Sequence, residues 1–200
     1  SPSRACLLTG QSAHANGMLG LAHRGFGLTV PEHHIIHTLA DHGYTSVLAG
    51  VQHIASSGAV PAWKAIGYDK FLGAGRDAHS LAAGFLDGAP AEPFFLSVGL
   101  TETHREFPEM HPADDARYCL PPGPLPDAPE TREDMARYKA SVRELDRKMG
   151  VVLEALDAAG LAQRTLVICT TDHGIAFPRM KCNLTDAGTG VMLIMRGPGG

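Results

Sequence analysis

The sequence lacks several features that mark specialised classes of protein. It has only four cysteines in 200 residues, with neither a CxxC pair nor zinc-finger spacing, which argues against a structural zinc site. No apolar run approaches membrane-spanning length, and Ser1–Arg4 has neither the charged start nor the apolar core of a signal peptide. The 17 basic residues do not outnumber the 21 acidic ones. We therefore expect no nucleic-acid partner and no membrane partner.

What is present fits a globular α/β protein. Hydrophobic residues make up 44% of the chain and charged residues 19%, a balance typical of one domain with a substantial core. Four segments read as helices: 1–10, 32–42, 77–86 and 131–160. Segments 45–49, 92–100, 166–169 and 190–196 read as strands, 62–73 as a turn with aromatic anchors, and 108–129 as an ordered surface loop.

The segment 131–160 shows the clearest helical period in the chain. Its apolar residues recur at alternating spacings of three and four, which predicts one long amphipathic helix with a core-facing stripe. The stripe consists of Met135, Tyr138, Val142, Leu145, Met149, Val152 and Leu156.

The rest of the chain is interpreted around the segment 166–174. An apolar run that predicts a buried strand, Leu166 to Cys169, is followed at once by two threonines, Asp172, His173 and Gly174. Ligands of open α/β sheets bind outside the carboxyl ends of the strands, so Asp172 and His173 are well placed to hold a metal ion. The alternative is that Asp172 caps a helix and His173 is a solvated loop residue.

Two further predicted strands also end in histidine-containing segments. The strand 45–49 leads into His53, and the strand 92–100 leads into His104 and Arg105. Either histidine taken alone is more often a solvated or structural residue than a functional one. Polar groups after three strands favour a common site at one edge of the sheet.

A resemblance to a known family rests on these segments together. Pro2-Ser3-Arg4, followed after three residues by Leu8-Thr9-Gly10, resembles the sulfatase signature, and Thr171–Gly174 resembles that family's metal-binding segment. The resemblance covers essentially the whole chain in the family's order. It implies an alkaline-phosphatase-like core, a mixed, mostly parallel sheet between helices. Around Phe177-Pro178 the chain looks most similar to the heparan N-sulfatase (sulfamidase) subgroup.

The resemblance also implies a reaction and its groups. In sulfatases a Cys or Ser two residues before the Pro is oxidised to formylglycine, whose hydrated aldehyde attacks sulfur; that position would precede Ser1. Arg4 would orient this nucleophile, His53 and Lys181 would hold the sulfate, and His104 would protonate the leaving oxygen. Arg179 is the fallback for Lys181. Asp172 and His173 would bind one divalent cation, which oxygen-rich ligation suggests is Ca²⁺, although His173 leaves room for a softer metal.

One departure from the family keeps other functions open. Val51 stands where the family usually has a lysine, which removes one expected cationic contact. Besides a sulfatase acting on a sulfated small molecule or sugar, we therefore consider a phosphonate or phosphodiester hydrolase. A catalytically inactive sulfatase-like protein that binds sulfated glycans is the third possibility.

The resemblance also bears on the domain organisation. We interpret residues 1–200 as a partial catalytic domain, truncated at both ends, that lacks the first strand, the nucleophile and the C-terminal subdomain. We expect this segment alone to be inactive. The family suggests a periplasmic, secreted or lysosomal location.

Overall fold

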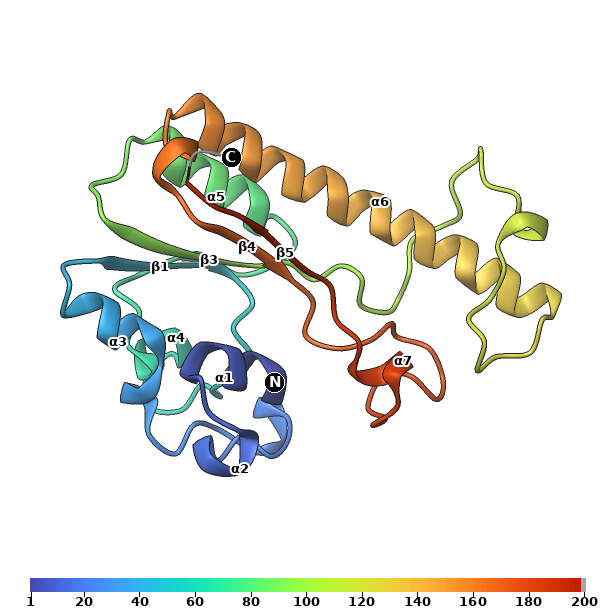
Figure 1. Cartoon of the computed structure of the whole chain (residues 1–200), viewed down its shortest axis with the longest axis horizontal. Coiled ribbons are helices and arrows are strands. Elements are labelled where there is room, and N and C mark those ends of the chain that lie inside the picture. Colours follow the sequence, from blue (N-terminus) through green and yellow to red (C-terminus); the bar gives the residue numbers. More distant parts are fainter. Residues whose placement is uncertain (199–200) are drawn as a thin grey trace. The chain divides into compact units, whose positions relative to one another are not determined.

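The structure is a computed structural model that describes residues 1–198, and the chain divides into two units (Figure 1). The N-terminal unit comprises Ser1–Leu100 together with Glu154–Leu161, and the C-terminal unit comprises Thr101–Leu153 together with the chain from Ala162 onward. No helix in the described part of the chain is both long and apolar enough to cross a membrane. The two units are described separately below.

A parallel three-stranded sheet forms the centre of the N-terminal unit. Its strand order is β2 (Lys70–Gly73), β1 (Thr45–Gly50) and β3 (Phe94–Gly99). The central strand β1 is buried from Ser46 onward. Helix α5 (Ala78–Asp87) and helix α3 (Ile35–Ala40) lie on opposite sides of this sheet (Figure 1). This arrangement confirms the predicted α/β class.

Short helices complete the N-terminal unit. The helices are α1 (Pro2–Thr9), α2 (Ala13–Asn16) and α4 (Ala62–Ile66), with 3₁₀ turns η1 (Ala22–Arg24) and η2 (Pro31–His33). As predicted, α1 begins with a proline in its first turn and ends at Gly10, which adopts a left-handed conformation with φ 66°.

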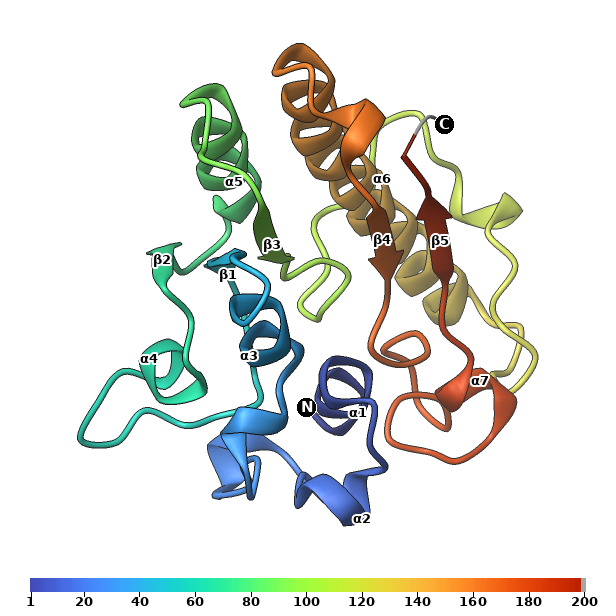
Figure 2. The same ribbon diagram turned by 60° about the vertical axis from the view of Figure 1, so that its left-hand side comes forward.

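Helix α6 and a pair of strands dominate the C-terminal unit. Helix α6 spans Pro129–Ala158, and its last residues cluster with the N-terminal unit. Strands β4 (Val167–Thr170) and β5 (Leu193–Arg196) pair antiparallel, and Figure 2 shows them beside α6. Cys169 Sγ of β4 lies 3.8 Å from Met149 Sδ of α6. The short helix α7 (Asp186–Thr189) and the 3₁₀ turns η3 (Ala116–Tyr118) and η4 (Ala162–Arg164) complete this unit.

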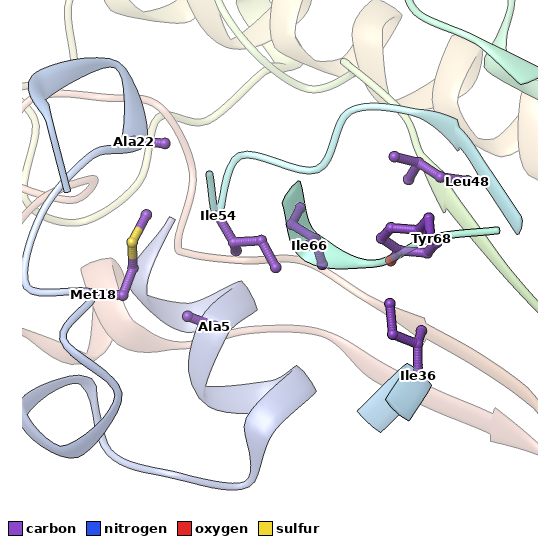
Figure 3. Packing of buried hydrophobic residues seen from close by; sticks show 8 residues of the cluster. All are labelled: Ala5, Met18, Ala22, Ile36, Leu48, Ile54, Ile66 and Tyr68. Carbon is purple, nitrogen blue, oxygen red and sulfur yellow. The ribbon is translucent and has the colours of Figure 1, made fainter. Parts of the chain in front are cut away.

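The apolar core of the N-terminal unit joins its helices to strand β1. Leu48 of β1 and Ile66 of α4 are almost fully buried, and Ala5 of α1 belongs to the same cluster. Figure 3 shows the cluster, whose members are Ala5, Met18, Ala22, Ile36, Leu48, Ile54, Ile66 and Tyr68. Helix α1 is thereby fixed within this unit by packing.

Two glycines allow the ends of β1 and β3 to approach closely. Gly50 has φ 82°, and a Cβ on it would lie 2.2 Å from the Gly99 carbonyl oxygen. A Cβ on Gly99 would lie 2.0 Å from the Val51 carbonyl oxygen. Side chains at either position would push the strands apart, so these glycines fix the start of the segment that carries His53.

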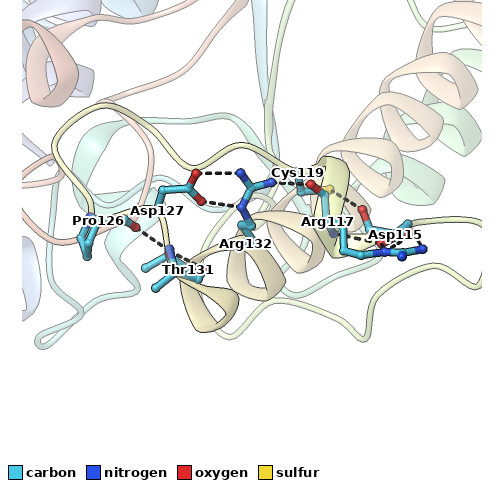
Figure 4. A network of polar contacts seen from close by, with 8 residues as sticks. Asp115, Arg117, Cys119, Pro126, Asp127, Thr131 and Arg132 are labelled. Carbon is cyan, nitrogen blue, oxygen red and sulfur yellow. Dashed lines mark hydrogen bonds and ion pairs between the residues drawn. The ribbon is translucent and has the colours of Figure 1, made fainter.

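The predicted surface loop 108–129 is ordered by polar contacts to α6. Arg132 of α6 pairs with Asp127 and also donates to the Arg117 carbonyl oxygen (Figure 4). Thr131 Oγ1 donates to the Pro126 carbonyl oxygen at 2.7 Å. The loop contains one 3₁₀ turn, η3, whose Asp115 side chain accepts a hydrogen bond from Arg117 N.

Two predictions of secondary structure are wrong in the N-terminal unit. The helix predicted over 32–42 is instead the turn η2 followed by the shorter helix α3, because the His34 ring accepts a hydrogen bond from Ile36 N and starts a new helix there. The turn predicted over 62–73 contains both helix α4 and strand β2. Strand β2 has only four residues and lies at the sheet edge, so its sequence gives little alternation.

Two predictions of burial are wrong in the C-terminal unit. The strand predicted as buried is half exposed, because its side chains alternate between two faces: Leu166 and Ile168 are 52% and 50% exposed. On α6, Val142 of the predicted apolar stripe is exposed, whereas Lys148 is buried. Lysine occupies the buried face because it pairs there with a glutamate, as described below.

Candidate functional site

In the N-terminal unit, Arg4 and the segment of His53 come together. Arg4 Nη1 of α1 lies 3.5 Å from the carbonyl oxygen of Val51, two residues before His53. His53 itself adopts a left-handed backbone conformation with φ 53°, which is uncommon for a residue with a side chain. The Gln52 side chain accepts hydrogen bonds from the amides of Ile54 and Ala55 and so closes a tight turn around His53.

In the C-terminal unit, the structure brings His104 and Lys181 into direct contact, although 77 positions separate them. Lys181 Nζ lies 2.9 Å from His104 Nε2, and His104 Nδ1 lies 3.1 Å from the Arg105 carbonyl oxygen. Because an ammonium only donates and a carbonyl only accepts, a neutral His104 carries its proton on Nδ1. Its Nε2 lone pair therefore faces Lys181.

Asp172 and His173 follow β4 as a pair of potential metal ligands. His173 Nε2 lies 3.5 Å from Asp172 Oδ1, and both side chains are partly exposed. His173 Nδ1 donates to the Gly174 carbonyl oxygen at 2.6 Å, which leaves Nε2 to act as an acceptor. A backbone carbonyl on the second ring nitrogen is the usual support of a metal-binding histidine.

These two side chains fit a divalent cation but do not complete its coordination. Among the described residues, no group of three or more His, Cys, Asp or Glu side chains could hold a metal ion. A carboxylate and an imidazole supply two donors, whereas divalent cations take at least four. A cation bound by Asp172 and His173 would therefore need further ligands.

Gly174 determines how closely the chain after Asp172 and His173 approaches helix α7. Its amide donates to the Gly188 carbonyl oxygen at 2.8 Å, and a Cβ on it would lie 1.9 Å from the Ala187 carbonyl oxygen. Phe177 and Met180 in the same segment are buried. The chain before helix α7 therefore folds back against that helix at Gly174, and only glycine fits at this position.

A buried ion pair anchors the segment of His104 to α6. Lys148 Nζ lies 2.7 Å from Glu102 Oε1, and their side chains are 5% and 10% exposed. Burial would raise the pKa of Glu102, but the hydrogen bond and the charge of Lys148 outweigh burial, so this pKa is lowered. Glu102 is therefore ionised at neutral pH, and Lys148 can lie on the buried face of α6.

The chain is similar to known proteins of one family. The Sulfatase family model matches residues 1–200. Human N-sulphoglucosamine sulphohydrolase is 31% identical and is matched over 99% of this chain and 46% of its own length. Mouse iduronate 2-sulfatase is 30% identical over 54% of this chain and 27% of its own length. The chain thus spans about half or less of the length of these curated relatives.

Solved structures of other proteins share the fold of this chain. A putative sulfatase, yidJ, from Bacteroides fragilis superposes with a TM-score of 0.79 at 19% identity, over 99% of this chain and 57% of its own. The structure of Ps i-CgsB in complex with k-i-k-neocarrahexaose gives a TM-score of 0.67 at 19% identity, over 98% of this chain and 55% of its own. At 19% identity, the similarity to these two structures shows a shared fold alone.

The chain has an α/β fold, and it is the fold of the solved structure from Bacteroides fragilis. Among proteins with this fold, the chain belongs to the sulfatase family. The predicted resemblance to the sulfamidase subgroup is confirmed by the human relative named above. The family in general implies a divalent metal and a formylglycine residue.

The predicted site residues belong to both units of the chain, and the structure also shows contacts that the sequence did not predict. Arg4 and His53 belong to the N-terminal unit, and His104, Asp172, His173 and Lys181 belong to the C-terminal unit. Sequence reasoning treated Arg105 only as a neighbour of His104, and it missed the Glu102–Lys148 pair. The available signal was that Lys148 stands three residues after Leu145 and four before Val152, a spacing that places it beside the apolar stripe.

Proposed function

We propose that the full-length protein is a sulfuric ester hydrolase that removes an ester-linked or N-linked sulfate from a sulfated sugar or small molecule. Family membership supports the reaction class. The observation that carries the proposal is the contact between Lys181 Nζ and His104 Nε2, because a cation for the sulfate oxygens stands beside a group that can transfer a proton. The human relative's name makes a sulfated glucosamine the first substrate to test.

In this proposal each predicted residue has one task. Lys181 and His53 bind non-bridging oxygens of the sulfate, and His104, acting as the imidazolium, gives its Nε2 proton to the leaving oxygen and keeps its Nδ1 proton. Arg4 orients the nucleophile, the formylglycine that would precede Ser1. Asp172 and His173 contribute ligands to a divalent cation, for which we propose Ca²⁺. When bound, that cation would neutralise negative charge on the nucleophile and the sulfate.

Matched aryl esters test the reaction class. The full-length protein is assayed with p-nitrophenyl sulfate and with p-nitrophenyl phenylphosphonate, which share a leaving group and differ in the group transferred. We expect the sulfate to be the better substrate. A large preference for the phosphonate would overturn the proposal in favour of the second candidate, which the absence of a lysine at Val51 motivates.

Substitution of Lys181 tests the sulfate contact. We expect Lys181→Ala to lower kcat/KM for the sulfate ester about 100-fold, because one preorganised charged donor is lost. Lys64→Ala, which removes an exposed lysine on α4, serves as the matched control and should leave the rate unchanged. Equal rates for the two variants would remove Lys181 from the site.

Calorimetry with a sulfated oligosaccharide distinguishes an enzyme from a protein that only binds. Binding without turnover, in protein whose residue before Ser1 is unmodified by mass spectrometry, would favour the inactive homologue. Turnover that disappears with chelator and returns with Ca²⁺ would support both the hydrolase and the proposed metal. Return with Zn²⁺ or Mn²⁺ alone would contradict the choice of Ca²⁺.

A further inference from the structure

The Arg105 side chain makes hydrogen bonds to two different segments and contacts two aromatic rings. Its Nη1 donates to Asp134 Oδ1 of α6 at 3.0 Å, its Nη2 pairs with Asp134 Oδ2, and its Nε donates to the Ala176 carbonyl oxygen at 2.7 Å. The guanidinium carbon also lies 4.4 Å from the ring centroid of Phe107 and 5.0 Å from that of Phe177. The guanidinium is thus bonded in its plane and contacted by two rings.

These contacts join the two segments that carry His104 and Lys181. Arg105 is adjacent to His104, and its own carbonyl oxygen lies 3.1 Å from His104 Nδ1. Ala176 and Phe177 belong to the segment between His173 and Lys181, and the amide of Lys181 donates to the Ile175 carbonyl oxygen at 3.3 Å. Arg105 therefore fixes the backbone on both sides of the contact between His104 and Lys181.

Three aromatic rings pack together where Arg105 joins the two segments. The rings of Phe107, Tyr138 and Phe177 lie within 5.5 to 5.7 Å of one another, centroid to centroid, and Phe177 is buried. Each ring comes from a different part of the C-terminal unit: the His104 segment, α6 and the Lys181 segment. A lysine at position 105 would keep the charge but could not make the three planar hydrogen bonds at once.

We propose that Arg105 is a positioning residue: it holds the His104 ring so that Nδ1–H donates to the Arg105 carbonyl oxygen and so that Nε2, which carries a second proton when His104 acts as the acid, can give that proton to the leaving oxygen. This inference rests on the proposed hydrolase function. Arg105 itself touches neither the sulfate nor the nucleophile in this scheme. Its effect should therefore depend on how much the leaving group needs a proton.

A series of aryl sulfates provides the test in the full-length protein. A nitrophenolate leaves with little help, whereas phenolate from phenyl sulfate needs a proton from the acid. For Arg105→Lys we expect kcat with p-nitrophenyl sulfate to stay within about 3-fold of wild type and kcat with phenyl sulfate to fall about 30-fold, a part of the 10²- to 10⁴-fold that general acids contribute. KM should change little for either substrate, because Lys181 still binds the sulfate.

Arg143 of α6, the helix that also carries Asp134, offers a matched control. It also makes a bidentate pair, with Asp114, at 2.7 and 2.5 Å, but contacts neither the His104 segment nor the Lys181 segment through that pair. Arg143→Lys should leave both rates unchanged. Asp134→Asn should repeat the Arg105→Lys pattern more weakly, and the double variant should lose less than the two single losses combined, because both residues act through one contact.

The outcomes separate this inference from the proposed function. Equal losses on both aryl sulfates, or an Arg105→Lys variant that behaves like Arg143→Lys, would overturn the positioning role. No turnover of any sulfate ester by correctly modified wild-type protein would instead overturn the proposed function. If Arg105→Lys does not fold, judged by circular dichroism, Asp134→Asn with the same two substrates decides the matter.

Discussion

The two units of this chain are stabilised by different kinds of contact. The N-terminal unit has a buried parallel sheet, an apolar cluster around Leu48 and two glycines at touching strand ends. In the C-terminal unit, charged side chains of α6 hold the segments packed on it, and β4 and β5 keep large apolar side chains exposed. Salt does not weaken apolar burial, whereas it screens exposed ion pairs. The comparison predicts that different perturbations will loosen the two units.

The largest effect should come from the contact between strand ends. Gly50→Ala places a methyl group 2.2 Å from the Gly99 carbonyl oxygen at a residue with φ 82°, which combines overpacking with backbone strain. We expect a loss of about 4 kcal/mol of unfolding free energy. Denaturant unfolding, with amide hydrogen exchange to assign it to residues 45–50, provides the measurement.

Gly58→Ala is the control for this prediction, because a Cβ at Gly58 would meet no atom within 4 Å. It should be close to neutral. An equally small effect at Gly50 would show that the strand ends can separate at little cost, and the rigid description of the N-terminal unit would be wrong.

Acid should weaken the N-terminal unit through His34. This side chain is fully buried and packs edge-on against Tyr68, and burial, with a smaller contribution from the charge of His37, lowers its pKa from 6.5 to about 4. The unfolded chain therefore binds a proton between pH 6.5 and about 4 that the folded chain does not. Stability should be full above pH 6.5 and fall by up to about 3 kcal/mol as the pH drops to 4.

His34→Asn isolates this contribution, because asparagine can still accept the hydrogen bond from Ile36 N that starts α3. The variant should lose most of the pH dependence of the unfolding free energy between pH 4 and 6.5. His42→Asn, at an exposed position, should retain it. A variant curve parallel to that of wild type would assign the acid sensitivity to other groups.

Breaking the buried ion pair should loosen the C-terminal unit by a smaller amount. Glu102→Gln leaves the Lys148 ammonium buried without its Glu102 partner, while Glu144 Oε1 lies 3.8 Å from Lys148 Nζ. We expect a loss of about 2 kcal/mol, below the 3 to 5 kcal/mol of a fully orphaned charge, because Glu144 compensates in part. Hydrogen exchange over residues 129–153 should increase.

The Glu102–Lys148 pair also makes stability depend on pH, but the group concerned is a carboxyl that is charged in the folded chain, whereas His34 is neutral there. The pKa of Glu102 is lowered in the folded chain, so its stabilisation is present above the unfolded value and is lost as the pH falls through the folded one. Glu102→Gln should remove that acid-dependent part. Arg147→Gln, which breaks the exposed pair with Glu144, is the control and should change exchange little.

Added salt should change hydrogen exchange least of all these perturbations, but it should affect the two units differently. Raising the ionic strength to about 1 M shortens the screening length to about 3 Å, which weakens the exposed pairs Arg143–Asp114 and Arg132–Asp127. Exchange in the loop 108–129 should increase slightly, while exchange in β1 stays constant or slows. An equal increase in exchange in both units would show that they do not differ in the contacts that stabilise them.

The sequence predicted the parts of the fold that depend on strong local signals. Strands β1, β3 and β4, helices α1, α5 and α6, and the loop 108–129 lie within one to three residues of their predicted positions. Strand β2 was missed because four residues at a sheet edge carry no usable period. The split between η2 and α3 was missed because it depends on a side-chain hydrogen bond of His34.

The candidate site shows the same division. Places after strands pointed to His53, His104, Asp172 and His173, the resemblance to sulfatases added Arg4 and Lys181, and the roles of all six stay predictions. The sequence could not show that Arg105 bridges Asp134 and Ala176, because those partners lie 29 and 71 positions away. Such a contact exists only after both segments have packed against α6.

The sequence by itself determined the family, the order of the main elements and the chemical groups available at the strand ends, since these follow from local patterns and motif spacing. Only the tertiary structure decided that Lys181 meets His104, that Lys148 is buried against Glu102, and that the apolar strand β4 keeps one face exposed. The physical reason is that burial and pairing of charges depend on residues distant in sequence, whose approach no local pattern encodes.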